Sequence, residues 1–123
     1  MNKKKIMIVD DEPDIVKTLK IFLESEGYEV VSASDGVEAL ERIHKENPDA
    51  VILDIMLPRA DGYKVCRILK FDKKFRAMPV IIFTARAQEE DERMGKEVRA
   101  DAYITKPFEP EVLLAKLKEL LFE

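Results

Sequence analysis

The sequence predicts an α/β fold, a (βα)5 arrangement in which five parallel strands alternate with helices. Short apolar runs and stretches of helical periodicity follow one another along the chain, and that alternation predicts the fold. Three of the runs, residues 6–9, 50–53 and 80–83, are unbroken by polar side chains. Unbroken runs are typical of strands that helices cover on both faces. We therefore place these three strands in the middle of a parallel sheet.

Two further candidate strands, residues 28–33 and 101–105, mix polar with apolar side chains. A partly polar strand suits the edge of a sheet, where it is only partly covered. The predicted strand order is therefore 2-1-3-4-5, and right-handed crossovers place helices on both faces of the sheet. This five-stranded order is the one found in flavodoxin-like folds.

Apolar residues at helical spacing mark the helices between these strands. Pro13 suits the first turn of the first helix, Gly27 suits its end, and Asn47-Pro48 ends the second helix. A fourth, weakly amphipathic helix is predicted over about residues 88–98. The apolar positions of the other helices are Ile15, Leu19, Phe22 and Leu23 in the first, Val37, Leu40 and Ile43 in the second, Val65, Ile68 and Leu69 in the third, and Leu113, Leu117, Leu120 and Leu121 in the fifth.

Composition narrows the possible functions. The chain of 123 residues has 21 basic and 25 acidic side chains, and its net charge of −4 does not favour nucleic acid as a direct partner. Its single cysteine, Cys66, excludes an internal disulfide and falls in an apolar helical pattern, which predicts a buried thiol. No apolar run approaches the ~20 residues of a membrane helix, and no signal peptide is recognisable. We expect one domain over residues 1–123 and a cytoplasmic location.

Polar residues follow four of the predicted strands: Asp10 and Asp11 after the first, Asp54 after the third, Thr84 after the fourth and Lys106 after the fifth. Open parallel sheets bind ligands beyond the carboxyl ends of their strands. Two carboxylates ~4 Å apart repel by ~1 kcal/mol in water and by ~4 kcal/mol at an effective dielectric constant of ~20. Mg²⁺ relieves that repulsion and favours oxygen ligands. A carboxylate can attack phosphorus, and Thr84 and Lys106 are placed to compensate the developing charge.

Each of these motifs also has a plain structural interpretation. Acidic residues before Pro13 suit the start of a helix, Asp54 followed by Pro58 and Gly62 suits a turn, and Lys106-Pro107 suits an ordinary loop. Their joint position at one edge of the sheet favours the chemical interpretation.

Together, these residues resemble the receiver domain of bacterial two-component response regulators, including the chemotaxis regulators, along the whole chain. The resemblance implies a phosphoryl acceptor that needs Mg²⁺, takes its phosphoryl group from a phosphohistidine and acts as a conformational switch in a phosphorelay. The matching segments are Ile8-Val9-Asp10-Asp11-Glu12, Leu53-Asp54-Ile55-Met56-Leu57-Pro58, Asp61-Gly62, Phe83-Thr84-Ala85 and Tyr103-Ile104-Thr105-Lys106-Pro107-Phe108.

The resemblance also implies individual roles. Asp54 is the expected phosphoacceptor, and Lys106 is expected to pair with it or with the phosphoryl group. Mg²⁺, for which Mn²⁺ can substitute, is expected on Asp10, Asp11, Asp54 and the backbone carbonyl of Met56. Thr84 and Tyr103 are the expected switch residues, and Lys106-Pro107 is an expected cis peptide, which only proline makes tolerable.

The implied partners are a sensor histidine kinase or a histidine phosphotransfer protein, meeting the first helix and the loop at Phe108. A downstream target is expected on the face of the fourth helix, fifth strand and fifth helix. The chain is expected to catalyse only its own phosphorylation and dephosphorylation, so it is not an enzyme in the usual sense. Neither Met56 nor Arg86 is suited to activate an attacking water, which predicts a persistent phosphoryl group. His44, outside the acidic edge, is expected to be solvated.

One position departs from the family pattern. Arg99 stands where a glycine usually precedes the Ala-Asp of the fifth strand. A glycine there permits a left-handed helix end, so arginine predicts a longer or reshaped end of the fourth helix.

Other functions fit the residues less well. A phosphohydrolase of the haloacid-dehalogenase type needs a second aspartate where Met56 stands. A flavin carrier needs a phosphate-binding loop where residues 10–12 are acidic, and a P-loop nucleotidase needs a glycine-lysine run that is missing. A degenerate receiver used only for binding is expected to lack an acid or the lysine. Both a stand-alone relay protein and the receiver of a longer regulator remain open.

Overall fold

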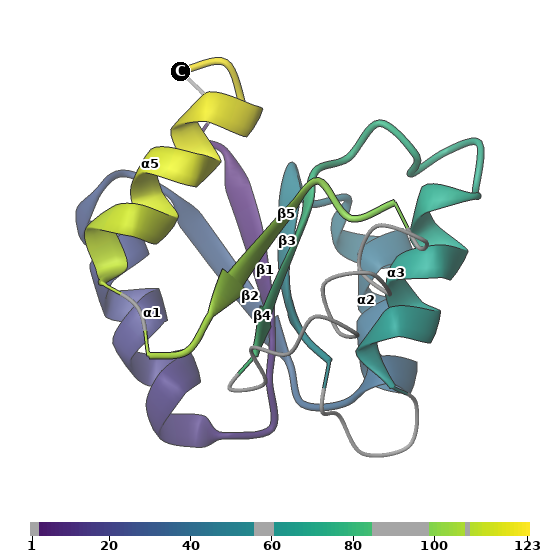
Figure 1. Ribbon diagram of the computed structural model, residues 1–123, viewed down its shortest axis with the longest axis horizontal. Coiled ribbons are helices and arrows are strands. Elements are labelled where there is room, and N and C mark those ends of the chain that lie inside the picture. The colour runs from purple at the N-terminus through teal and green to yellow at the C-terminus, as the bar shows by residue number, and fades with distance from the viewer. Residues whose placement is uncertain (1–2, 56–60, 85–98, 108) are drawn as a thin grey trace.

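A single parallel sheet forms the centre of the protein in the computed structural model, which describes residues 3–55, 61–84, 99–107 and 109–123 (Figure 1). The sheet has five strands in the order β2-β1-β3-β4-β5, and every neighbouring pair is parallel. The predicted order and the two predicted edge strands are confirmed. The strands are β1 Lys5–Val9, β2 Glu29–Ala33, β3 Ala50–Asp54, β4 Val80–Thr84 and β5 Ala102–Thr105.

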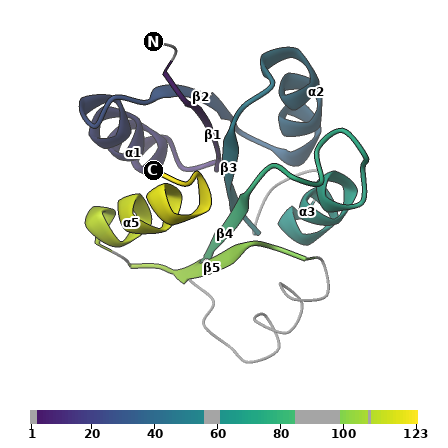
Figure 2. The same ribbon diagram turned by 90° about the horizontal axis from the view of Figure 1, so that it is seen from above.

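Helices cover both faces of this sheet. Helices α1 and α5 lie on one face and α2 and α3 on the other, as the view from above shows (Figure 2). The helices are α1 Pro13–Ser25, α2 Gly36–Glu46, α3 Gly62–Lys70 and α5 Pro110–Leu120. The predicted fourth helix, at about residues 88–98, lies outside the described residues. Within the described part of the chain, no helix is long and apolar enough to span a membrane.

Alternate residues of each strand feed two separate cores. In β1, Met7 and Val9 pack in the core beneath α2 and α3, whereas Ile6 and Ile8 pack in the core beneath α1 and α5. Successive side chains of a strand point to opposite faces, so an unbroken apolar run supplies both cores. Each fully buried aliphatic side chain contributes roughly 1.5–3 kcal/mol of transfer free energy. The uninterrupted runs therefore explain why the three central strands are covered on both sides.

Aspartate side chains cap the starts of α2 and α3. The Asp35 carboxylate accepts a hydrogen bond of 2.8 Å from the backbone N–H of Glu38 at the start of α2. Asp61 does the same at 2.9 Å with the N–H of Lys64 at the start of α3. Such caps satisfy N–H groups that have no partner within the helix. Helix α2 ends at Asn47, whose φ of 48° is left-handed.

The predicted apolar face of α3 is wrong at one residue. Val65 and Leu69 are buried, but Ile68 is 51% exposed. The buried side of α3 also includes Cys66 and the stem of Lys70, which centres it away from Ile68. At 100° per residue, Ile68 therefore lies on the solvent side. Burial raises the pKa of the Cys66 thiol to about 12, in agreement with the predicted buried thiol.

Arg99 keeps the left-handed backbone that a glycine favours, with φ of 62°. The predicted longer or reshaped end of the fourth helix concerns residues before Arg99, and since residues 85–98 lie outside the described part it stays a prediction. The Arg99 guanidinium lies 4.5 Å from the centroid of the Phe71 ring. This contact holds the side chain over α3 and helps to offset the strain of the backbone. His44 is exposed on α2, as expected.

Candidate functional site

Four carboxylates meet at the carboxyl end of the sheet. Asp10 follows β1 and Asp54 is the last residue of β3, and both are almost fully buried, with exposed fractions of 1% and 4%. Asp11 and Glu12 continue from Asp10 toward α1 and are exposed. One oxygen from each of the four lies within 4.8 Å of the others. The predicted convergence of Asp10, Asp11 and Asp54 is therefore present in the structure.

Lys106 supplies a positive charge to this group. Its Nζ lies 3.1 Å from Asp10 Oδ2, 3.1 Å from Asp54 Oδ2 and 3.3 Å from Glu12 Oε1. The same ammonium lies 4.5 Å from the centroid of the Phe83 ring in β4. The peptide bond between Lys106 and Pro107 is cis. One cation is thus held between two buried carboxylates and against the face of an aromatic ring.

The electrostatics of Asp10 and Lys106 reflect this crowding. Burial raises the pKa of the Asp10 carboxyl, against the opposing hydrogen bonds from the Glu12 N–H and the Lys106 ammonium. Burial lowers the pKa of Lys106, but its hydrogen bonds and charge interactions with Asp10 and Asp54 outweigh that effect and leave the pKa raised. The lysine therefore stays charged while the buried carboxylates of Asp10 and Asp54 beside it lack hydration. A further cation at this site would relieve the remaining repulsion.

The backbone at the end of β3, at Asp54 and Ile55, packs directly against Gly62 at the start of α3. The N–H of Gly62 donates a hydrogen bond of 3.0 Å to the carbonyl of Ile55. A Cβ at position 62 would lie only 2.4 Å from the Asp54 carbonyl oxygen and 2.4 Å from Ile55 Cα. Only glycine permits this approach, so the first turn of α3 supports the end of β3 directly.

The remaining predicted residues are less completely placed. Thr84 is the last residue of β4, in register with Thr105, so its backbone reaches the same edge of the sheet. Tyr103 in β5 is partly buried and packs against the core beneath α2 and α3. Met56, Arg86 and Phe108 lie outside the described residues.

Sequence reasoning missed two contributors to the site. The sequence places Glu12 only within a matching segment, whereas its carboxylate joins the acidic group and accepts a hydrogen bond from the Lys106 ammonium. Its position in the run of three acids was the available signal. Phe83 belongs to a predicted buried strand and to one of the segments that resemble the family, but no sequence feature indicates that Lys106 lies against its ring.

The ligand atoms that the acidic group offers determine which metal ions it suits. Every side chain of the cluster offers carboxylate oxygen, and neither histidine nor cysteine takes part. Oxygen-only donor sets suit hard cations such as Mg²⁺ and Mn²⁺, whereas zinc favours nitrogen and sulfur. The residues present therefore fit Mg²⁺.

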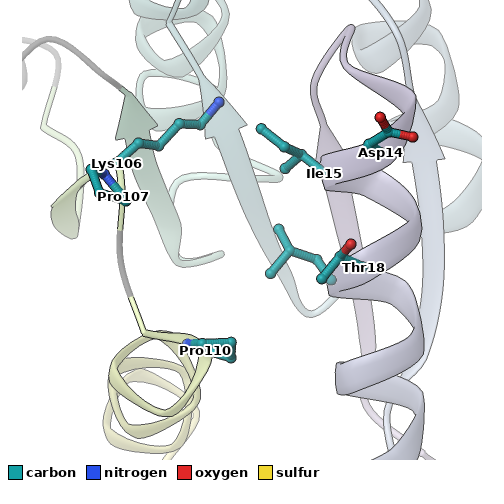
Figure 3. Close-up of a pocket in the computed structure, with 7 residues that line it drawn as sticks. Asp14, Ile15, Thr18, Lys106, Pro107 and Pro110 are labelled. Atoms are coloured by element: carbon teal, nitrogen blue, oxygen red, sulfur yellow. The ribbon is translucent and has the colours of Figure 1, made fainter.

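An apolar cavity of about 440 Å³ opens beside Lys106. Ile15 and Thr18 of α1 line one side of it, and Pro107 and Pro110 line the other (Figure 3). Lys106 belongs both to this cavity and to the acidic group, since its ammonium bonds Asp10 and Asp54. A macromolecule seated here would approach the acidic group from the side of α1.

Comparisons with known proteins agree with this geometry. A family model described as the response regulator receiver domain matches residues 6–118. The alkaline phosphatase synthesis transcriptional regulatory protein PhoP of Bacillus subtilis is 46% identical over 118 residues, which are 96% of this chain and 48% of that protein. The chain spans about half the length of the curated relatives it matches.

Two solved structures illustrate the likeness in three dimensions. A putative response regulator from Chloroflexus aurantiacus superimposes with a TM-score of 0.94 at 35% identity, covering 99% of this chain and 100% of that one. The BeF3-activated N-terminal receiver domain of Klebsiella pneumoniae RstA superimposes with a TM-score of 0.88 at 34% identity, covering 98% and 100% of the two chains.

Proposed function

The chain belongs to the family of response regulator receiver domains of two-component systems, and we propose that Asp54 is the residue on which it accepts a phosphoryl group. The observation that carries this proposal is the position of Asp54. Its buried carboxylate ends β3 within the group formed by Asp10, Asp11 and Glu12. Its Oδ2 lies 3.1 Å from the ammonium of Lys106. Receiver domains are signalling switches, and we propose that this chain catalyses only its own phosphorylation and dephosphorylation.

In the proposed step, a carboxylate oxygen of Asp54 attacks the phosphorus of a phosphohistidine. The new O–P bond forms as the N–P bond breaks, and the imidazole leaves with the electrons of that bond and takes up a proton. We propose that Lys106 turns from the carboxylate toward the new phosphoryl oxygens, since charge there needs compensation. Thr84, at the same edge of the sheet, is the proposed hydroxyl donor to those oxygens.

Asp10, Asp11, Asp54 and the carbonyl of Met56 are the groups that we propose would hold Mg²⁺ or Mn²⁺. When bound, the ion supplies positive charge that neutralises the phosphoryl oxygens. Asp10 accepts a hydrogen bond of 2.9 Å from the N–H of Glu12 through its Oδ1, which orients its carboxylate. The chain's own contribution is therefore to position these oxygens before phosphorylation.

We propose that phosphorylation changes the conformation through Thr84 and Tyr103. A hydroxyl drawn toward the phosphoryl group leaves space behind β4, and Tyr103 on the neighbouring strand is the side chain proposed to fill it. The resulting change would appear on the face of the fourth helix, β5 and α5, where a downstream target would bind.

The proposed donor is a sensor histidine kinase or a histidine phosphotransfer protein. The apolar cavity between α1 and Pro107 supports this assignment, because a donor seated there would reach Asp54 past Lys106. We further propose that residues 1–123 fold as a single receiver domain and act in the cytoplasm, without direct contact to nucleic acid.

The central test is phosphorylation by a small donor. The full chain is incubated with Mg²⁺ and acetyl phosphate, and its intact mass is measured before and after treatment with base. We expect one base-labile phosphoryl group in the wild type and in Asp72→Asn, a matched change of an aspartate outside the acidic group. Asp54→Asn should remain unmodified. An adduct that persists in Asp54→Asn would refute the assignment.

A further inference from the structure

Helix α3 presents a mixed cationic and apolar ridge to solvent. Lys64, Arg67, Ile68 and Phe71 lie at positions i, i+3, i+4 and i+7, which places them on one side of the helix. All four are exposed, and the apolar pair is exposed by 51% at Ile68 and 54% at Phe71. We call these four residues, together with Arg99, the α3 ridge.

Two arginine side chains, those of Arg67 and Arg99, lie near the Phe71 ring of the α3 ridge. The guanidinium of Arg99 lies 4.5 Å from the Phe71 centroid, and that of Arg67 lies 5.9 Å from it. Stacking on a ring restricts a guanidinium while leaving its N–H groups free to meet a carboxylate in a bidentate fork. Among the described residues, no carboxylate forms an ion pair with Lys64, Arg67 or Arg99. The two guanidinium groups near one ring therefore create a local excess of positive charge.

The positive charge extends beyond the ridge itself. Residues 62–79 contain six basic side chains and one acidic side chain, although the whole chain has a net charge of −4. The ridge runs along α3 from Lys64 in its first turn to Phe71 just after its end. Phe71 follows the end of α3 and Arg99 precedes β5, whereas Lys106 follows the carboxyl end of β5. The end of the ridge at Phe71 and Arg99 is therefore distinct from the proposed phosphorylation site, whereas Lys64 lies in the first turn of α3, whose Gly62 abuts the Asp54 backbone.

We propose that the α3 ridge is a docking surface for an acidic, amphipathic helix of a partner protein. The partner helix needs acidic flanks because its carboxylates would pair with Lys64, Arg67 and Arg99. It needs an apolar side because Ile68 and Phe71 are exposed and would pack against it. Arginine and aromatic residues dominate the binding energy of protein interfaces. A nucleic acid would pair with the cations but would leave the aliphatic Ile68 without an apolar partner.

The variants that test this surface are chosen to preserve the fold. Arg99→Gly removes a guanidinium at a position whose φ of 62° suits glycine, so the backbone is not strained. Arg67→Gln removes the second guanidinium from the exposed side of α3 while retaining a good helix former. The matched control is Lys45→Gln with Lys118→Gln, which removes two exposed cations from the last turns of α2 and α5.

The probe is a fluorescein-labelled synthetic helical peptide with leucines along one side and glutamates on both flanks. Binding is followed by fluorescence anisotropy and by the amide NMR signals of the ¹⁵N-labelled full chain. We expect saturable binding that shifts the signals of residues 64–71 and 99 and weakens with salt. The double variant, which combines Arg67→Gln with Arg99→Gly, should bind about tenfold more weakly or worse, and the control variant should bind like the wild type.

Several outcomes would overturn the proposal. These are a lack of saturable binding, equal affinity for the double variant, equal binding of a peptide with lysines in place of the glutamates, or signals that shift instead around Ile15 and Pro107. Tighter binding of a duplex DNA or of phosphatidylglycerol vesicles at the same residues would also overturn it. Phosphorylation of the double variant by acetyl phosphate is expected to match the wild type. A failure of peptide binding would therefore not count against the proposed role of Asp54, which the mass measurement tests separately.

Discussion

Lys106 Nζ lies 3.1 Å from Asp54 Oδ2, and the lysine side chain is only 13% exposed. The same atom lies 3.1 Å from Asp10 Oδ2, whose side chain is fully buried. One ammonium thus serves two carboxylates from different strands. Since little water reaches these groups, the lysine is the main compensation for their negative charge among the described residues.

Lys106→Met should destabilise the protein when divalent metal is absent. The change leaves Asp10 and Asp54 buried without their cation, so we expect the free energy of unfolding to fall by about 3 kcal/mol. Urea denaturation in EDTA measures this. Lys116→Met is the control, because it breaks the exposed ion pair between Lys116 and Glu119. That change should alter the free energy of unfolding by less than about 1 kcal/mol. Similar losses in both variants would contradict the prediction.

Asp54→Asn should stabilise the metal-free protein. Four carboxylates lie together and three of them pair with one ammonium, so removal of one negative charge reduces their repulsion. We expect the melting temperature in EDTA to rise by about 3–5 °C, which corresponds to roughly 1 kcal/mol in a domain of this size. The gain should shrink when Mg²⁺ is added. A lower melting temperature in EDTA would show that the pair with Lys106 outweighs the repulsion.

Gly62→Ala should destabilise the protein and slow its phosphorylation. The added methyl group would lie 2.4 Å from the Asp54 carbonyl oxygen, so β3 and α3 must separate. We expect a loss of about 2–3 kcal/mol in chemical denaturation. Gly27→Ala is a useful comparison, because its Cβ meets nothing within 4 Å and only its φ of +97° is unfavourable. That variant should lose about 1–2 kcal/mol and keep the wild-type rate of phosphorylation; a slowed rate there would contradict the steric explanation.

Cys66 should resist alkylation in the folded protein. Burial raises its pKa from 9.0 to about 12, so near pH 8 the folded thiol is ionised about 1,000-fold less than an unperturbed one. Between these two values the unfolded chain releases the proton first, so the thiol's contribution to stability is present below pH 9 and is lost as the pH rises toward 12. Labelling with iodoacetamide, with protein in guanidinium as the control, measures the difference. Equal rates would contradict the burial.

The phosphoryl group on Asp54 should persist. Met56 and Arg86 carry neither acid nor amide to activate an attacking water. We expect Met56→Asn, which introduces an amide two residues after Asp54, to shorten the lifetime of the phosphorylated protein several-fold. Intact mass measured over time after removal of acetyl phosphate gives both lifetimes. A wild-type lifetime no longer than that of the variant would contradict this expectation.

The sequence predicted the sheet because burial on two faces leaves a direct trace in it. The runs at 6–9, 50–53 and 80–83 became the three central strands, and the mixed runs became the edges. The positions of Asp10, Asp54 and Lys106 followed from the strand ends alone. Such inferences need only the rule that parallel strands end at one edge.

Other features depend on contacts that a local pattern does not encode. The exposure of Ile68 follows from the rotation of α3, which Cys66 and Lys70 decide through their burial. The left-handed turn at Arg99 occurs beside the ring of Phe71, a residue far away in the chain. The contact between the Lys106 ammonium and the Phe83 ring is a similar case. It forms because β4 and β5 are neighbours in the folded sheet, which no local pattern shows.

The close approach of Gly62 to the carbonyl of Asp54 has a mechanical consequence. With no space between the end of β3 and the first turn of α3, a displacement of the Asp54 backbone is transmitted directly to this helix. A helix is stiff along its axis, so a shift at Gly62 would be carried to Phe71 at the other end of α3. Helix α3 is thus a stiff link between the backbone of the proposed phosphoacceptor and Phe71.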